Sequence, residues 1–201
     1  MNIRIRSIFA IFLTALLIIC FSIMAGIITV RGVIEKSQET DLALMSDIAD
    51  HFISSEIKAL KIKAAAASEI LSLSDYSEWP DVIADIEKNH HEFFGISVLS
   101  EGSDLLASAG KFPANKELLN HTFIKQVFQG KTAISSVIQE TQAAVIYLAA
   151  PLKNDSILVF TLPCLYFSDL LSKFLIWETG HIFMDDVHGR LIANPRPSWV
   201  E

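Results

Sequence analysis

The chain has 201 residues, a formal net charge of −7 and two cysteines. This length allows one domain with a proper hydrophobic core in addition to an N-terminal segment. The acidic balance and the lack of a basic patch exclude the electrostatic footprint of a nucleic-acid-binding protein. Because Cys20 lies in an apolar stretch, Cys164 has no partner for an intrachain disulfide in the rest of the chain.

Residues 7–30 contain no charged side chain. A bilayer core needs about 20 consecutive apolar residues in a helix, and a lipid-embedded backbone must satisfy its own hydrogen bonds. Arg4 and Arg6 precede the stretch and favour a cytoplasmic N-terminus. The alternative is a cleaved signal peptide, whose apolar region of about 7–15 residues would be shorter. We therefore predict a cytoplasmic segment at 1–6, a transmembrane helix at 7–30 and an extracytoplasmic remainder in the cell inner or plasma membrane.

Residues 31–74 are predicted to continue as one stalk helix, since neither glycine nor proline occurs between Val33 and Trp79. Apolar residues recur at steps of three and four, which places them on one face of a helix. At 1.5 Å per residue, about 40 residues extend about 60 Å. The alternatives are a rod that carries movement and a helix packed on its own domain. The stripe comprises Leu42, Met45, Ala49, Phe52, Ile53, Ile57, Leu60, Ala64, Ala67 and Leu71.

Beyond residue 74 the pattern changes to alternating strands and short helices. Pro80 fits the first turn of a helix over 81–90, and further helices are predicted at 116–128 and 166–177. Strands are predicted at 94–99, 105–109, 132–138, 143–151 and 156–162, followed by a hairpin within 180–193. The predicted fold class is α+β, with a five-strand antiparallel sheet flanked by helices.

Four segments in this order resemble a known family. They are FIKQVFQGK at 123–131, YLAAPL at 147–152, LVFTLPCLYFSDLL at 158–171 and GHIFMDDVHGRLIANP at 180–195. Together with the N-terminal anchor and stalk they resemble the double-Cache, PAS-like sensor domain of bacterial receptors. The resemblance implies a membrane-distal module at 75–164, then a linker helix and the truncated start of a membrane-proximal module at 165–201. Because an isolated hairpin is only marginally stable, we expect residues 180–201 to be poorly ordered or docked on the first module.

The sequence carries no motif of a hydrolase, a metalloprotease or a nucleotide-binding enzyme. We predict no catalytic residue, no metal, no cofactor and no nucleic-acid partner, and we assign His181, Asp185, Asp186 and His188 to ordinary turn chemistry. The resemblance implies the sensory part of a signal-transduction receptor, in the first place a sensor histidine kinase. The alternatives are the sensor of a chemoreceptor or diguanylate cyclase, or a membrane-tethered interaction module without a small ligand.

The family places its ligand pocket between the sheet and the helix predicted at 116–128. The candidate ligand-binding residues are His121, Lys125, Ser135, Tyr147 and Thr161. Amino-acid-binding members carry an arginine and a tryptophan at this helix and an aspartate on the next strand. Residues 119–123 and 137–139 lack them, and an ammonium group without a carboxylate is costly to bury. We therefore predict no amino-acid site of that kind, and the small-molecule ligand stays unknown.

The stalk predicts an assembly as well. Its apolar stripe is longer than one small sheet can cover, because a strand extends only about 20 Å. An exposed apolar seam of this kind marks a partner surface. We predict a parallel homodimer through the stalk helix, with the seam at Leu42, Met45, Ala49 and Phe52.

Overall fold

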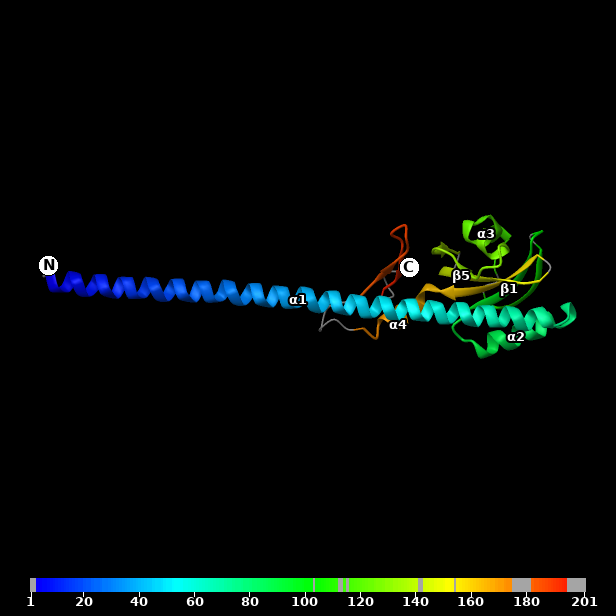
Figure 1. The fold of residues 1–201 in the computed structure, drawn as a ribbon, viewed down its shortest axis with the longest axis horizontal. Coiled ribbons are helices and arrows are strands. Elements are labelled where there is room, and N and C mark those ends of the chain that lie inside the picture. Colours follow the sequence, from blue (N-terminus) through cyan, green and yellow to red (C-terminus); the bar gives the residue numbers. More distant parts are fainter. Residues whose placement is uncertain are drawn as a thin grey trace. The chain divides into compact units, whose positions relative to one another are not determined.

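The computed structural model describes residues 3–102, 104–111, 114, 116–140, 143–153, 155–174 and 182–194 (Figure 1). The chain divides into two compact units, Met1–Asp47 and Ile48–Glu201. Helix α1 (Ile3–Leu73) belongs to both, since it runs without a break across the boundary. The prediction of one uninterrupted helix through the anchor and the stalk is therefore confirmed.

The first unit consists of the N-terminal part of α1. This helix is long and apolar enough to cross a membrane, and it is the only described helix for which this holds. Large apolar side chains such as Leu17, Phe21 and Ile27 are exposed along it. Helices that are apolar on all faces need an apolar environment. Within the helix, the Thr29 hydroxyl donates to the Ala25 carbonyl at 2.9 Å, so this polar group has an internal partner.

The second unit is built on an antiparallel sheet with the strand order β2-β1-β6-β5-β3. A further short strand, β4, also pairs with β5. Every residue of β6 is buried, which places this strand at the centre. The predicted antiparallel sheet of five strands is confirmed, with β3 and β4 sharing the place of one predicted strand beside β5. The long strands are β1 (Gly95–Ser100), β2 (Leu105–Gly110), β5 (Ala144–Pro151) and β6 (Ser156–Pro163).

The strand predicted at 132–138 is instead two short strands, β3 (Ala133–Ile134) and β4 (Ile138–Gln139). Ile134 pairs with Leu148 and Ile138 pairs with Val145. Between these two pairs, the three residues 135–137 on the edge face the two residues 146–147 of β5. One extra residue is the definition of a β-bulge, which interrupts a strand and bends it. The extra residue could not be seen in the alternation of the sequence.

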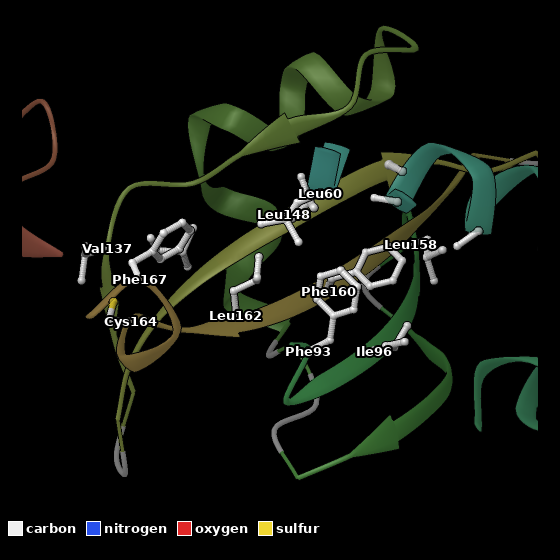
Figure 2. Close-up of a cluster of buried hydrophobic side chains, with 14 of the residues drawn as sticks. Leu60, Phe93, Ile96, Val137, Leu148, Leu158, Phe160, Leu162, Cys164 and Phe167 are labelled. Carbon is white, nitrogen blue, oxygen red and sulfur yellow. The ribbon is translucent and has the colours of Figure 1, made fainter. Parts of the chain in front are cut away.

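Two groups of buried apolar residues cover the two faces of the sheet. The α1-face cluster includes Leu60, Ala64 and Leu71 of α1, which pack with Phe160 and Phe167 (Figure 2). Helices α2 (Trp79–Asn89) and α4 (Cys164–Leu171) contribute to the same cluster. The α3-face cluster is smaller and lies on the opposite side (Figure 1).

The helix predicted at 116–128 is broken into a 3-10 helix, η2 (Lys116–Asn120), and helix α3 (Thr122–Phe128). His121 between them has an extended backbone, with φ −76° and ψ 142°, and forms the N-cap position of α3. Its carbonyl accepts a hydrogen bond of 3.1 Å from the amide of Ile124 in the first turn of α3. The helix predicted at 166–177 begins earlier, directly after Pro163, and ends at Leu171. Residues 175–177 of this prediction lie outside the described residues.

The C-terminal hairpin consists of β7 (Met184–Asp185) and β8 (Leu191–Ala193). Ile192 and Ala193 are buried against the α1-face cluster, and the Asn194 amide donates to the Ser168 hydroxyl of α4 at 3.1 Å. Of the two outcomes expected for this segment, docking on the preceding module is the one seen in residues 182–194.

Candidate ligand-binding site

The candidate site lies on the face of the sheet that α3 covers. Side chains alternate between the two faces of a strand, so alternate residues of β1, β5 and β6 point toward α3. Most of them are apolar and pack on Phe123, Ile124 and Val127 of α3. Two of the polar ones, Tyr147 of β5 and Thr161 of β6, stand directly opposite each other in the ladder. Both belong to the predicted site, and the structure brings them together.

Tyr147 is fully enclosed by the α3-face cluster. Its hydroxyl donates a hydrogen bond of 2.7 Å to Oε1 of Glu140. Burial, and then the bond and the negative charge of Glu140, raise the pKa of Tyr147 far above the ordinary value for a phenol. The phenol therefore keeps its proton at all physiological pH values and acts here as a hydrogen-bond donor.

Ser135 touches the same tyrosine through the backbone. Its amide donates to the Tyr147 carbonyl at 2.8 Å, and its hydroxyl oxygen accepts the Tyr147 amide at 2.9 Å. The hydroxyl in turn donates to the carbonyl of Ser136. The Ser135 side chain therefore replaces a backbone carbonyl in the ladder beside the bulge, and its position depends on the strand rather than on a ligand.

His121 and Lys125 do not join the buried group. Both side chains are exposed, one at the start of α3 and the other within it. The His121 ring lies near the Phe123 ring, with 6.3 Å between centroids. The five predicted site residues thus fall into two sets, an enclosed set on the sheet and an exposed set on the helix.

The residues that sequence reasoning missed are Glu140 and Ser97. Ser97 of β1 is fully buried on this face, and its hydroxyl accepts the Ala114 amide at 2.9 Å. Glu140 supplies a carboxylate next to the predicted region 137–139, where none was expected. The alternation of β1 could have identified Ser97, but the contact of Glu140 with Tyr147 depends on the register of β4 against β5.

The part of the chain that contains the candidate site has no arginine that could bind a ligand. None occurs between Arg31 and Arg190, and arginine is the side chain that binds a carboxylate through two parallel hydrogen bonds. Residues 32–189 therefore cannot form the usual clamp for a ligand carboxylate, whereas Glu140 could accept a donor or a cation.

A second polar cluster lies on the α1 side. Tyr166 of α4 donates to Glu56 of α1, and burial, then Glu56, raise the pKa of this tyrosine as well. Lys63 of α1 donates to Glu92 at 2.7 Å. These pairs fasten helix to helix and helix to loop.

Among the described residues, no three His, Cys, Asp or Glu side chains are close enough to hold a metal ion. Asp186 accepts the amides of His188 and Arg190 at 2.8 and 2.9 Å. This is the turn chemistry that we expected for this segment. His181 lies outside the described residues.

No family model matches this sequence, and no curated protein matches it. Several solved structures have the same fold. The ligand-binding domain of the Campylobacter jejuni chemoreceptor Tlp3, bound to 4-methylisoleucine, aligns with 83% of this chain and 73% of its own, with 9% identity and a TM-score of 0.65. That of the Pseudomonas fluorescens chemoreceptor CtaA, bound to L-isoleucine, aligns with 85% and 74%, with 14% identity and a TM-score of 0.64.

The extracellular domain described as that of a histidine kinase, mmHK1S-Z2, aligns with 81% of this chain and 74% of its own, with 15% identity and a TM-score of 0.62. The chain therefore has the fold of the ligand-binding domains of these chemoreceptors and of the extracellular domain of this histidine kinase. These structures are described as ligand-binding or extracellular domains, and none of them is described as a catalytic domain.

Proposed function

We propose that this chain is the extracytoplasmic sensory part of a single-pass membrane receptor of bacterial signal transduction, and that it binds a small molecule. The observation that carries the proposal is the likeness in fold to chemoreceptor and kinase ligand-binding domains over more than four fifths of the chain. The apolar start of α1 supports a membrane anchor. The cytoplasmic position of the N-terminus is part of the proposal and rests on Arg4 and Arg6 before this stretch. The division into a distal module at 75–164 and the start of a proximal one at 165–201 belongs to the same proposal.

The proposed ligand site is the α3 face, with Tyr147, Thr161 and Ser135 on the sheet and His121 and Lys125 on the helix. Glu140 joins them, because its carboxylate already binds the Tyr147 hydroxyl. Tyr147 and Thr161 are closed to solvent, so a ligand has to displace α3 or the chain before it. Helix α3 has only seven residues and follows a break at His121, and we propose that it is the element that moves.

The ligand class is constrained by the charges on this face. Although Tlp3 and CtaA domains bind amino acids, this chain has no arginine in residues 32–189. We propose that it does not bind amino acids through a carboxylate clamp. Glu140 is the one feature of this face that argues against this proposal. Its carboxylate could pair with the ammonium group of an amino acid, which needs such a partner when it is buried.

The test uses the full chain in nanodiscs. Thermal shift is measured with a panel of amino acids, amines, organic acids and sugars, and calorimetry follows any compound that raises the melting temperature. At least one compound should stabilise the wild type and have a weaker effect on Glu140→Gln and Tyr147→Phe. Tyr76→Phe, at an exposed tyrosine outside the site, serves as the control and should respond as the wild type. Binding that ignores all α3-face substitutions would contradict the site, and clear micromolar binding of amino acids would contradict the proposed ligand class.

An interaction module without a small ligand is the second candidate. Tyr147 and Thr161 are enclosed by the chain's own side chains, and the Tyr147 hydroxyl has an internal acceptor. A face that is filled in this way favours a structural role. If no compound in the panel shifts the melting temperature, this second candidate replaces the first.

The output domain of the receptor is proposed to be a histidine kinase, with a chemoreceptor or a diguanylate cyclase as alternatives. The similar structures include both a kinase and chemoreceptors. The reading frame that follows the sensory part in the genome distinguishes these outputs, because each has its own cytoplasmic motifs.

We also propose that the receptor is a parallel homodimer through α1. Leu42 and Met45 of the predicted seam are exposed, whereas Ala49 faces the core of its own unit. Phe52 is partly covered by Phe174, with 5.3 Å between ring centroids. A second apolar row lies on another flank of the helix at Ile48, Ile62 and Leu73, of which Ile62 is 61% and Leu73 78% exposed. Steps of 14 and 11 residues are close to whole turns of a helix, so this row extends the partner surface.

A further inference from the structure

The segment 135–140 contacts the side-chain clusters on both faces of the sheet. It contains the bulge between β3 and β4, where three residues face two of β5. On one side of this segment lies Tyr147 of the candidate site, and on the other side lie α4 and the C-terminal hairpin. Few backbone pairs hold the segment to the sheet, since β3 and β4 have two residues each.

On the α3 side, the segment is tied to Tyr147 at both of its ends. At the start, Ser135 exchanges two hydrogen bonds with the Tyr147 backbone. At the end, Glu140 accepts the Tyr147 hydroxyl at 2.7 Å. A group that competes for the carboxylate of Glu140 or for the hydroxyl of Tyr147 therefore acts directly on this segment.

On the opposite side, Val137 anchors the segment in the α1-face cluster. Figure 2 shows Val137 beside Phe167 and Cys164 of α4 at one end of this cluster. The carbonyl of Val137 accepts a hydrogen bond of 3.3 Å from the Arg190 guanidinium of the C-terminal hairpin. The extra residue of the bulge makes this possible, because unbroken alternation from Ala133 would place Val137 on the α3 face. Instead Val137 packs in the α1-face cluster and Ile138 packs against the α3-face cluster.

We propose that segment 135–140 couples the α3 face to the C-terminal hairpin. A change at the Tyr147–Glu140 bond moves the bulge, and the bulge shifts the Val137 carbonyl away from Arg190. A bulge is suited to this role because its extra residue allows a local shift of one edge without breaking the rest of the sheet. The inference rests on the proposed function, in that the bond it starts from lies in the proposed ligand site. In a receptor, the hairpin would then report the state of that site to the part of the chain that follows.

The test needs no ligand and is therefore independent of whether the ligand screen succeeds. Hydrogen–deuterium exchange of the full chain in nanodiscs is measured for Glu140→Gln, Arg190→Ala and the double variant. Glu140→Gln should raise the exchange rate of the hairpin peptide over 186–194 several-fold. In the Arg190→Ala background the same substitution should add little, because the coupling contact is already absent.

The matched control for Arg190→Ala is Lys153→Ala. Lys153 also donates to a backbone carbonyl at 3.3 Å, that of Ser72, but it lies away from the bulge. In this background Glu140→Gln should keep its full effect on the hairpin. If Glu140→Gln and Tyr147→Phe both leave the hairpin unchanged, or if Glu140→Gln acts equally in the Arg190→Ala background, the coupling does not exist.

A peptide from α2 is the internal reference for general loosening of the unit. If Glu140→Gln raises its exchange too, Tyr147→Phe decides, because this substitution removes the donor of the Tyr147–Glu140 hydrogen bond and leaves the charge of Glu140 in place. An increase confined to the hairpin in Tyr147→Phe supports the proposal. An increase shared with α2 in both variants would overturn it.

Discussion

Among single residues, Cys164 gives a direct measure of how tightly the second unit is closed. The thiol is buried at the start of α4, and burial raises its pKa to about 11. Only the thiolate reacts with alkylating reagents. At pH 8, this pKa by itself should slow alkylation about 100-fold compared with an ordinary cysteine.

The measurement uses a Cys20→Ser chain, in which Cys164 is the only cysteine, and iodoacetamide at pH 8. The matched control replaces Cys164 by serine and introduces Ser172→Cys, an exposed position just after α4. Comparable rates at the two positions would show that Cys164 is accessible and that the α1-face cluster opens easily.

At the level of elements, the alanines of α1 set the distance between this helix and the sheet. Ala64 is fully buried against the sheet, whereas its neighbour Ala65 is exposed. A larger side chain at a filled position forces neighbouring groups apart and typically costs about 1–3 kcal/mol. Ala64→Leu should therefore lower the free energy of unfolding by this amount, and Ala65→Leu should change it by less than about 0.5 kcal/mol. Urea denaturation measures both, and equal effects would mean that α1 is not packed as described.

A second element-level prediction concerns the contact of α1 with the loop after α2. Burial by itself would raise the pKa of Glu92, but the hydrogen bond and the charge of Lys63 outweigh it and leave the pKa below its ordinary value of 4.5. A lowered folded pKa means that ionised Glu92 stabilises the fold. This contribution is fully present above pH 4.5 and is lost as the pH falls through the lowered value.

Glu92→Gln should therefore destabilise the chain by about 0.5 kcal/mol at pH 7, a modest amount because Lys63 remains 42% exposed. At pH 3 the difference should be smaller than at pH 7, because the stabilising charge of Glu92 is lost as the pH falls through its lowered pKa. Glu35→Gln is the control, since the Arg31–Glu35 pair lies on the exposed surface of α1. Thermal melts at the two pH values decide, and a difference that persists unchanged at pH 3 would exclude the charge as its cause.

At the level of the whole molecule, the apolar rows of α1 predict how two copies meet. In membranes, Ile48→Asp and Ile62→Asp should weaken the dimer, because an unpaired carboxylate is expensive to bury. Ser54→Asp, at an exposed polar position of the same helix, should leave it intact. Cysteine cross-linking along residues 41–56 should follow steps of three and four residues. If cross-linking is uniform, or if both isoleucine variants dimerise normally, α1 serves only as a stalk.

The sequence by itself determined the features that depend on local periodicity. The uncharged stretch at 7–30 predicted the apolar part of α1, and the recurring apolar residues predicted its buried stripe through Leu60, Ala64 and Leu71. Alternation and apolar runs located the long strands to within one or two residues. These signals are readable because helices and strands impose their own periods on neighbouring residues.

Only the tertiary structure decided the features that depend on register between distant segments. The alternation around Ser135 gave no sign of the bulge, which exists because Ile134 and Ile138 pair with β5 in different registers. The contact of Glu140 with Tyr147 follows from this pairing, and it places a carboxylate where the sequence indicated none. The docking of the hairpin on α4 through Asn194 likewise joins residues that are 26 positions apart. A local pattern cannot encode such contacts, because they are selected by the free energy of packing whole elements together.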